Sequence, residues 1–86
     1  MATVAEVLAA GLDSVALIDS IDADASSVPA CEGLSQSEIN ELVQRNVDHL
    51  EIIKAYKKVD GTTSIWTTED FTDIDAAITA GKALVA

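Results

Sequence analysis

Histidine chemistry is the first possibility that the sequence offers, because the stretch RNVDHLEIIKAY at positions 45 to 56 holds the chain's single histidine and single tyrosine. A histidine can act as a general acid or base near neutral pH, and Arg45 and Tyr56 lie within two helical turns of His49. Catalysis would also need a nucleophile or a second titrating group aimed at the imidazole. The chain has no Gly-Ser elbow, no second histidine and no suitably placed cysteine. We therefore interpret His49 as a residue at the margin of a packed helix, and we expect no enzymatic activity and no small-molecule substrate.

Cation binding is the second possibility, in the acidic segment DADASSVPACEG at positions 22 to 33. Three residues match the first ligand positions of an EF-hand loop, namely Asp22, Asp24 and Ser26. Ser27 replaces the glycine of the sharp turn, however, and Gly33 stands where the bidentate glutamate belongs. We therefore predict a solvated loop without a metal or cofactor. An irregular site that uses Glu32 is the alternative.

Two other polar side chains have a structural interpretation. Cys31 is the single cysteine, so no intrachain disulfide can form, and no basic neighbour in the sequence would activate its thiol. We expect it to be inert. Asn46 falls near the centre of the apolar arc of its helix, where an amide needs hydrogen-bond partners, so we predict a structural polar contact there.

The composition favours a small aliphatic domain with an acidic surface. Apolar residues make up 49% of the 86 residues and aromatic residues only 3%, so the core must be built mainly from aliphatic side chains, which suits helices. The formal charge of −10 repels phosphate backbones and anionic lipid surfaces. We therefore expect neither nucleic acid nor membrane as a partner. With no basic leader and no apolar run of about 18 residues, we also expect neither a signal peptide nor a membrane span.

The first helix is predicted from about Thr3 to Ile21. Thr3 and Glu6 have capping-box spacing, and apolar residues then recur on one face at helical intervals. Gly11 lies within this apolar stripe, and Gly81 lies in the corresponding stripe of the last helix. Because glycine is less favourable than alanine in a helix by about 1 kcal/mol, we interpret both as positions where helices one and three cross closely.

The second helix is predicted over about 36 to 58. Ser35 and Glu38 have capping-box spacing, and Leu34 and Ile39 have the spacing of a hydrophobic staple. Lysines near its C-terminal end oppose the negative pole of the helix dipole.

The third helix is predicted over about 68 to 84. Thr67 is its expected cap, and Trp66 and Phe71 have staple spacing. Gly81 is either a C-terminal stop or an interior residue, and we favour the latter because the following KALVA keeps the helical periodicity.

Three amphipathic helices with polar connections predict one all-α domain over residues 1–86, folded as an up-down-up three-helix bundle. The second connection, KKVDGTTSI at 57 to 65, contains Asp60-Gly61 between β-branched residues. This pattern predicts either a short two-residue hairpin or a plain loop between helices two and three.

Leu17 and Ile52 are the candidate partner-contact residues. Each falls on a helix face that is otherwise occupied by charged side chains. Single exposed apolar residues are ordinary, but two of them on a narrow acidic bundle favour a subunit that docks on something larger.

The order of three segments, EVLAAGLDSVALIDSI, RNVDHLEII and WTTEDFTDIDAAITAGKAL, resembles small uncharacterised proteins encoded in the genomes of tailed bacteriophages. The resemblance covers nearly the whole chain except the two loops, which are longer here. It implies a phage-encoded helical protein that is a minor structural component of the particle, such as a capsid cement, decoration or head–tail accessory subunit. It transfers no functional residue.

Three hypotheses follow. The first is a non-catalytic virion protein, made in the host cytoplasm, whose partners are other virion proteins or further copies of itself. The second is an acidic intracellular adaptor or inhibitor that binds a basic site on a host protein, which the charge of −10 supports. The third is a metal-binding or catalytic domain, for which His49 and the acidic loop are the candidates.

Overall fold

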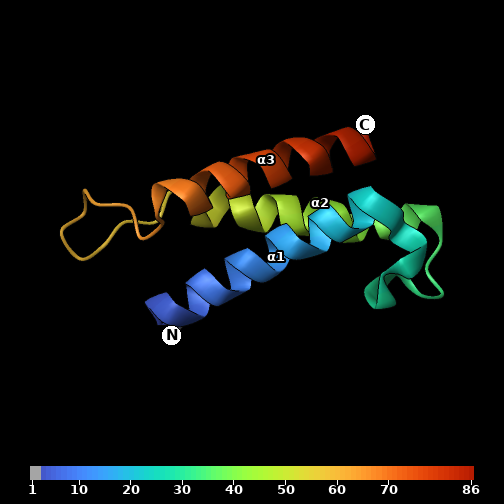
Figure 1. Ribbon diagram of the computed structural model, residues 1–86, viewed down its shortest axis with the longest axis horizontal. Coiled ribbons are helices and arrows are strands. Elements are labelled where there is room, and N and C mark those ends of the chain that lie inside the picture. Colours follow the sequence, from blue (N-terminus) through green and yellow to red (C-terminus); the bar gives the residue numbers. More distant parts are fainter. Residues whose placement is uncertain (1–2) are drawn as a thin grey trace.

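The computed structural model describes residues 3–86, so Met1 and Ala2 of the predicted domain lie outside the described residues. Its three helices are α1 (Val4–Asp24), α2 (Gln36–Ile53) and α3 (Thr68–Val85). Each helix packs against the other two, and α2 runs antiparallel to its neighbours (Figure 1). The predicted up-down-up three-helix bundle is therefore confirmed.

The three helix starts are capped as the sequence predicts. The Thr3 hydroxyl accepts a hydrogen bond from the Glu6 backbone N–H at 3.1 Å, and the Glu6 carboxylate accepts one from the Thr3 N–H in return. Ser35 and Glu38 form the same reciprocal pair at α2. At α3, the Thr67 hydroxyl accepts from the backbone N–H three residues on, at 3.0 Å. These local bonds satisfy backbone donors that have no partner within the helix.

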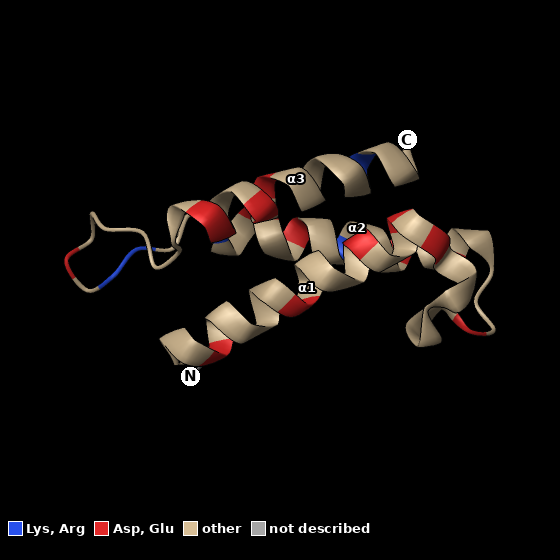
Figure 2. Cartoon of the chain, viewed as in Figure 1, with Lys and Arg blue, Asp and Glu red and all other residues tan. Residues whose placement is uncertain are grey.

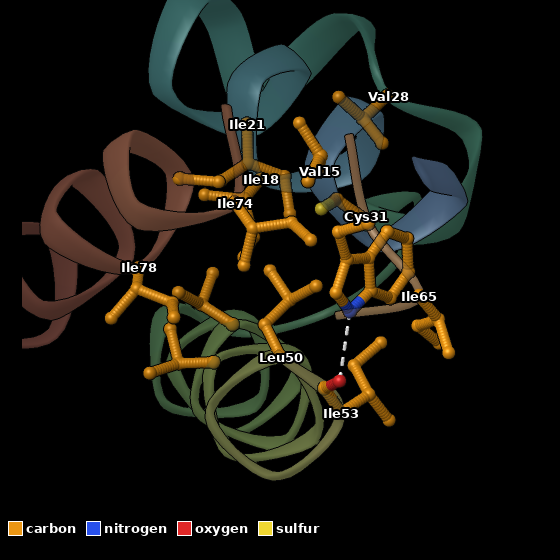
Figure 3. Packing of buried hydrophobic residues seen from close by; sticks show 14 residues of the cluster. Val15, Ile18, Ile21, Val28, Cys31, Leu50, Ile53, Ile65, Ile74 and Ile78 are labelled. Atoms are coloured by element: carbon orange, nitrogen blue, oxygen red, sulfur yellow. Dashed lines mark hydrogen bonds between the residues drawn. The ribbon is translucent and has the colours of Figure 1, made fainter. Parts of the chain in front are cut away.

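The predicted end of the second helix is wrong, because α2 ends at Ile53 and not near residue 58. The indole N–H of Trp66 donates to the Ile53 carbonyl oxygen at 2.9 Å (Figure 3). The backbone N–H of Tyr56 donates to the same oxygen at 3.1 Å. A side chain 13 residues away thus satisfies one of the terminal carbonyls. The helical periodicity of residues 36–58 does not predict this contact, because Trp66 lies outside that range.

A loop with one antiparallel bridge, between Lys57 and Ser64, connects α2 to α3. Asp60 and Gly61 do not close a two-residue hairpin, because they lie within a longer turn in which the Gly61 N–H donates to the Lys58 carbonyl at 2.8 Å. Gly61 has a φ of +73°, a conformation that residues with a Cβ rarely adopt.

The first connection is shorter and better packed than predicted. Helix α1 continues to Asp24, and two 3₁₀ turns follow, η1 (Ala25–Ser27) and η2 (Pro29–Cys31). Val28 and Cys31 are buried in the hydrophobic core, so the segment is not a wholly solvated loop. The chain uses these two side chains to close the end of the bundle between α1 and α2.

Aliphatic side chains from all three helices fill the core, and Trp66 is the large aromatic residue among them (Figure 3). Gly11 and Gly81 are both buried at close approaches, but they do not mark a crossing of α1 on α3 at each other. A Cβ on Gly11 would lie 2.5 Å from the Trp66 ring, whereas one on Gly81 would collide first with Val47 of α2. Each glycine therefore makes room for a particular side chain.

Candidate partner-contact surfaces

His49 is half-buried on α2, at the margin of its packed face, and Arg45 is exposed on the polar side. Tyr56 is not on the helix as predicted, because α2 has already ended, and its side chain is 43% exposed. The three side chains of the opening motif therefore do not form a common cluster on one helix.

Asn46 makes the structural polar contact that its position in the apolar arc predicts. Its side-chain oxygen accepts a hydrogen bond from the Ser14 hydroxyl of α1 at 2.9 Å. Its side-chain NH₂ donates to the backbone carbonyl of Leu42 at 2.8 Å. Ser14 is buried, so this pair satisfies a polar atom inside the α1–α2 interface.

The acidic segment does not gather its side chains around a point. The Asp24 carboxylate accepts hydrogen bonds from the backbone N–H and the hydroxyl of Ser26, at 3.1 and 2.6 Å, and so caps η1. Across residues 3–86, no three His, Cys, Asp or Glu side chains are placed to hold a metal ion.

The two predicted partner-contact residues differ in exposure. Ile52 is 63% exposed on the outer face of α2, next to the exposed Asp48. Leu17 is half-buried against the core and lines a shallow pocket of about 240 Å³ with η1 and η2, together with Val28 and Pro29. Ile52 is therefore the more accessible of the two candidates, and most of the Leu17 side chain packs within the molecule.

Two further groups of apolar side chains are exposed, one on α1 and one in the α2–α3 connection. On α1, Val4 is 54% exposed and Leu12 is 41% exposed. In the α2–α3 connection, Val59 is fully exposed beside Tyr56. The sequence places Val4 and Leu12 in the apolar stripe of the first helix, and for these two the expectation of burial is wrong. The first turns of α1 diverge from α2 and α3 (Figure 1), so the other helices do not cover Val4.

Charge is distributed unevenly over the molecule (Figure 2). All five Lys and Arg residues lie at or after Arg45, so α1 carries acidic residues and no basic ones. Within residues 3–86, ion pairs join Lys54 to Asp75 at 3.3 Å and Lys82 to Glu51 at 3.4 Å. One pair joins the residue that follows α2 to α3 and the other joins α2 to α3, so within residues 3–86 no α1 carboxylate takes part in an ion pair.

Hydrogen bonding perturbs one carboxyl group in the α2–α3 connection. The Asp60 carboxylate accepts bonds from the hydroxyl and the backbone N–H of Thr63 and from the backbone N–H of Thr62, at 2.6, 2.8 and 2.9 Å. These bonds, those from Thr63 first, hold the pKa of Asp60 well below its ordinary value. The charged form of Asp60 thus stabilises the turn over residues 60–63 by accepting these hydrogen bonds.

No helix within residues 3–86 combines the length and the apolar character needed to cross a bilayer.

No protein-family model matches the chain, and comparisons with curated proteins and with solved structures give no match either. The features of this chain that bear on its function are therefore its exposed apolar side chains and its uneven charge.

Proposed function

We propose that the chain is a non-catalytic accessory subunit of a bacteriophage particle and acts through protein–protein contacts. The observation that carries the proposal is the exposure of large apolar side chains on a small, highly charged bundle, above all Ile52 at 63%. Apolar side chains that remain outside a finished core are available to a partner surface. The resemblance to small phage-encoded helical proteins supports placing that partner in the virion, as a capsid or head–tail component.

The test is the composition of the particle. Particles of a phage that encodes this chain are purified on a density gradient, and mass spectrometry measures the copy number of the chain relative to the major capsid protein. We expect recovery at a fixed ratio. An Ile52→Asp chain should fold but be depleted from particles, whereas Asp48→Asn, on the same face of α2, should be incorporated normally. Absence of the wild-type chain from particles, despite abundant protein in the infected cell, would contradict the proposal.

A second candidate is an acidic intracellular adaptor or inhibitor that covers a basic site on a host protein. The absence of Lys and Arg from the first 44 residues favours it, because α1 then presents carboxylates without interspersed positive charge. This function predicts a soluble complex whose dissociation constant rises steeply with salt, and no copies in purified particles. The two candidates are thus separated by where the chain is found.

A further inference from the structure

An acidic groove and a basic loop lie at opposite ends of this molecule (Figure 1). The groove runs between α1 and the two 3₁₀ turns, and the residues that line it include Leu17, Ser20, Val28 and Pro29. The basic loop consists of Tyr56, Lys57, Lys58 and Val59. We propose that this groove, the α1–η groove, binds the basic loop of a second copy of the chain.

The α1–η groove is continuous and partly apolar. It consists of two adjoining hollows of about 240 and 280 Å³ that share Ser27, Val28 and Pro29. Leu17 is half-buried there and Pro29 is exposed, so apolar surface of both residues is accessible. A partner side chain that enters the groove can therefore bury apolar area, which stabilises the contact.

The rim of the α1–η groove is acidic. Asp13 precedes Leu17 by four residues and Asp24 follows Ser20 by four, so both lie on the face of α1 that borders the groove. Glu32 lines the groove beside η2. All three acidic residues are exposed, and none forms an ion pair within residues 3–86. Because the first 44 residues hold no Lys or Arg, the groove favours a cationic occupant.

The basic loop supplies a cationic occupant within the same chain. Lys57 and Lys58 are exposed, and neither takes part in the ion pairs found in the described part of the chain. Tyr56 and Val59 on either side of them are exposed as well, so the loop also offers apolar surface. The carboxylate of Asp60, the next residue, accepts hydrogen bonds within its own turn.

The other basic side chains are less available to a partner. Lys54 and Lys82 are already held in the ion pairs with Asp75 and Glu51. Arg45 is exposed, but acidic residues stand four positions before it and three positions after it on the same helix, which is the spacing of neighbours on a helix surface. The basic loop is therefore the cationic segment that best matches the α1–η groove.

The two surfaces lie too far apart to meet within one chain. The loop projects from one end of the 43 Å long axis, and the 3₁₀ turns lie at the other end (Figure 1). Two copies aligned antiparallel place each loop beside the groove of the other copy, so a twofold pair makes the contact twice. Each copy carries a charge of −10. At 0.15 M ionic strength, however, charges interact strongly only within about 8 Å, so the local opposite charges decide the contact.

This inference rests on the proposal that the chain acts through protein–protein contacts. Its test needs no virus particle, so the two can fail separately. A chain that dimerises but is absent from particles contradicts only the proposed function. Sedimentation equilibrium at physiological salt, up to about 1 mM protein to detect a weak contact, measures the oligomeric state. We expect the wild-type chain to form dimers.

Two charge-reversed variants identify the surfaces. The loop variant carries Lys57→Glu and Lys58→Glu, and the groove variant carries Asp13→Lys and Glu32→Lys. Each variant alone should dimerise at least about tenfold more weakly, because its contacts then join like charges. An equal mixture should form a one-to-one heterodimer, because both of its loop–groove contacts join opposite charges.

Two controls separate this contact from general effects of charge and of apolar surface. Glu41→Lys with Asp48→Lys changes the net charge by as much as the groove variant does, but on α2, and should leave the dimer at least as strong. Val59→Ser and Ile52→Ser each remove an exposed apolar side chain, and only Val59→Ser should weaken the dimer. Circular dichroism checks that every variant is helical.

Four results would overturn the inference. The first is a monomeric wild-type chain at every concentration, and the second is undiminished dimerisation of the loop variant. The third is a mixture of the loop and groove variants that forms no heterodimer. The fourth is a dimer that Ile52→Ser abolishes, which would assign the contact to α2.

Discussion

Trp66 joins three parts of the fold through one side chain. Its ring lies against Gly11 of α1, where any side chain would collide with it. Its indole N–H donates to the carbonyl of Ile53 and so marks the end of α2. The residue itself immediately precedes the cap of α3. A single aromatic residue therefore contacts α1, the end of α2 and the start of α3 at the end of the bundle where the α2–α3 connection lies.

Trp66→Phe should lower the free energy of unfolding by about 1–3 kcal/mol, because the buried Ile53 carbonyl loses a hydrogen-bond donor and the smaller ring leaves space beside Gly11. Urea unfolding followed by circular dichroism measures the loss. Tyr56→Phe, which removes an exposed aromatic hydroxyl, is the control and should change stability by less than about 0.5 kcal/mol. Equal effects of the two substitutions would show that the indole bond contributes nothing.

At the scale of elements, α1 and α2 are connected by the polar pair Ser14 and Asn46 within an otherwise aliphatic interface. The pair adds specificity of a kind that aliphatic packing does not, since the two polar atoms meet at one register of the helices. The same atoms are unfavourable if either loses its partner.

Asn46→Leu alone should therefore destabilise the protein by about 1–3 kcal/mol, because the buried Ser14 hydroxyl loses its acceptor. Adding Ser14→Ala should recover much of that loss, since no unpaired polar atom then remains in the interface. The measurement is a double-mutant cycle of unfolding free energies. Strictly additive effects would contradict coupling between the two side chains.

The α2–α3 connection should respond to acid through Asp60. Its folded pKa is lowered by the hydrogen bonds from Thr63 and Thr62, so these bonds contribute fully above its ordinary pKa of about 3.9. They are lost as the pH falls below that value and through the lower folded pKa. Amide NMR shifts of Thr62 and Thr63 should therefore stay constant from neutral pH to about 4 and change only in stronger acid. In Asp60→Asn this change should be absent, and an unaltered titration would assign it to another group.

The whole molecule is an elongated rod with dimensions of 43 × 24 × 17 Å and a radius of gyration of 13.5 Å. A compact chain of this length would have a radius of about 12 Å. Its net charge of −10 is therefore spread along a long axis (Figure 2). Two ion pairs between α2 and α3 neutralise little of it.

Salt should stabilise this fold. At about 0.01 M ionic strength, charges interact over roughly 30 Å, which is most of the molecule, whereas at 0.15 M they interact over about 8 Å, which includes only near neighbours. Screening therefore relieves repulsion among the carboxylates, and the melting temperature should rise by several degrees between the two conditions. A variant with Asp13→Asn and Asp19→Asn should show a smaller rise. A melting temperature that falls with salt would mean that attractive pairs dominate.

The sequence by itself determined the elements that depend on neighbouring residues. The helix starts at Thr3, Ser35 and Thr67 were predictable because a cap and the backbone N–H that it satisfies lie within three residues of each other. The three-helix architecture followed from apolar periodicity and short connections. That Asn46 makes a hydrogen bond was also predictable, because an amide in the apolar arc of α2 needs hydrogen-bond partners.

Tertiary structure decided the features that depend on residues distant in the chain. The carbonyl of Ile53, the last residue of α2, accepts a hydrogen bond from the indole of Trp66, which lies beyond the α2–α3 connection in the sequence. Which side chain fills the space at Gly11, and whether Leu17 is covered while Ile52 is not, depends in the same way on how the three helices pack. Local patterns record which face of a helix is apolar, but only packing determines how much of that face is used inside the molecule and how much is left for a partner.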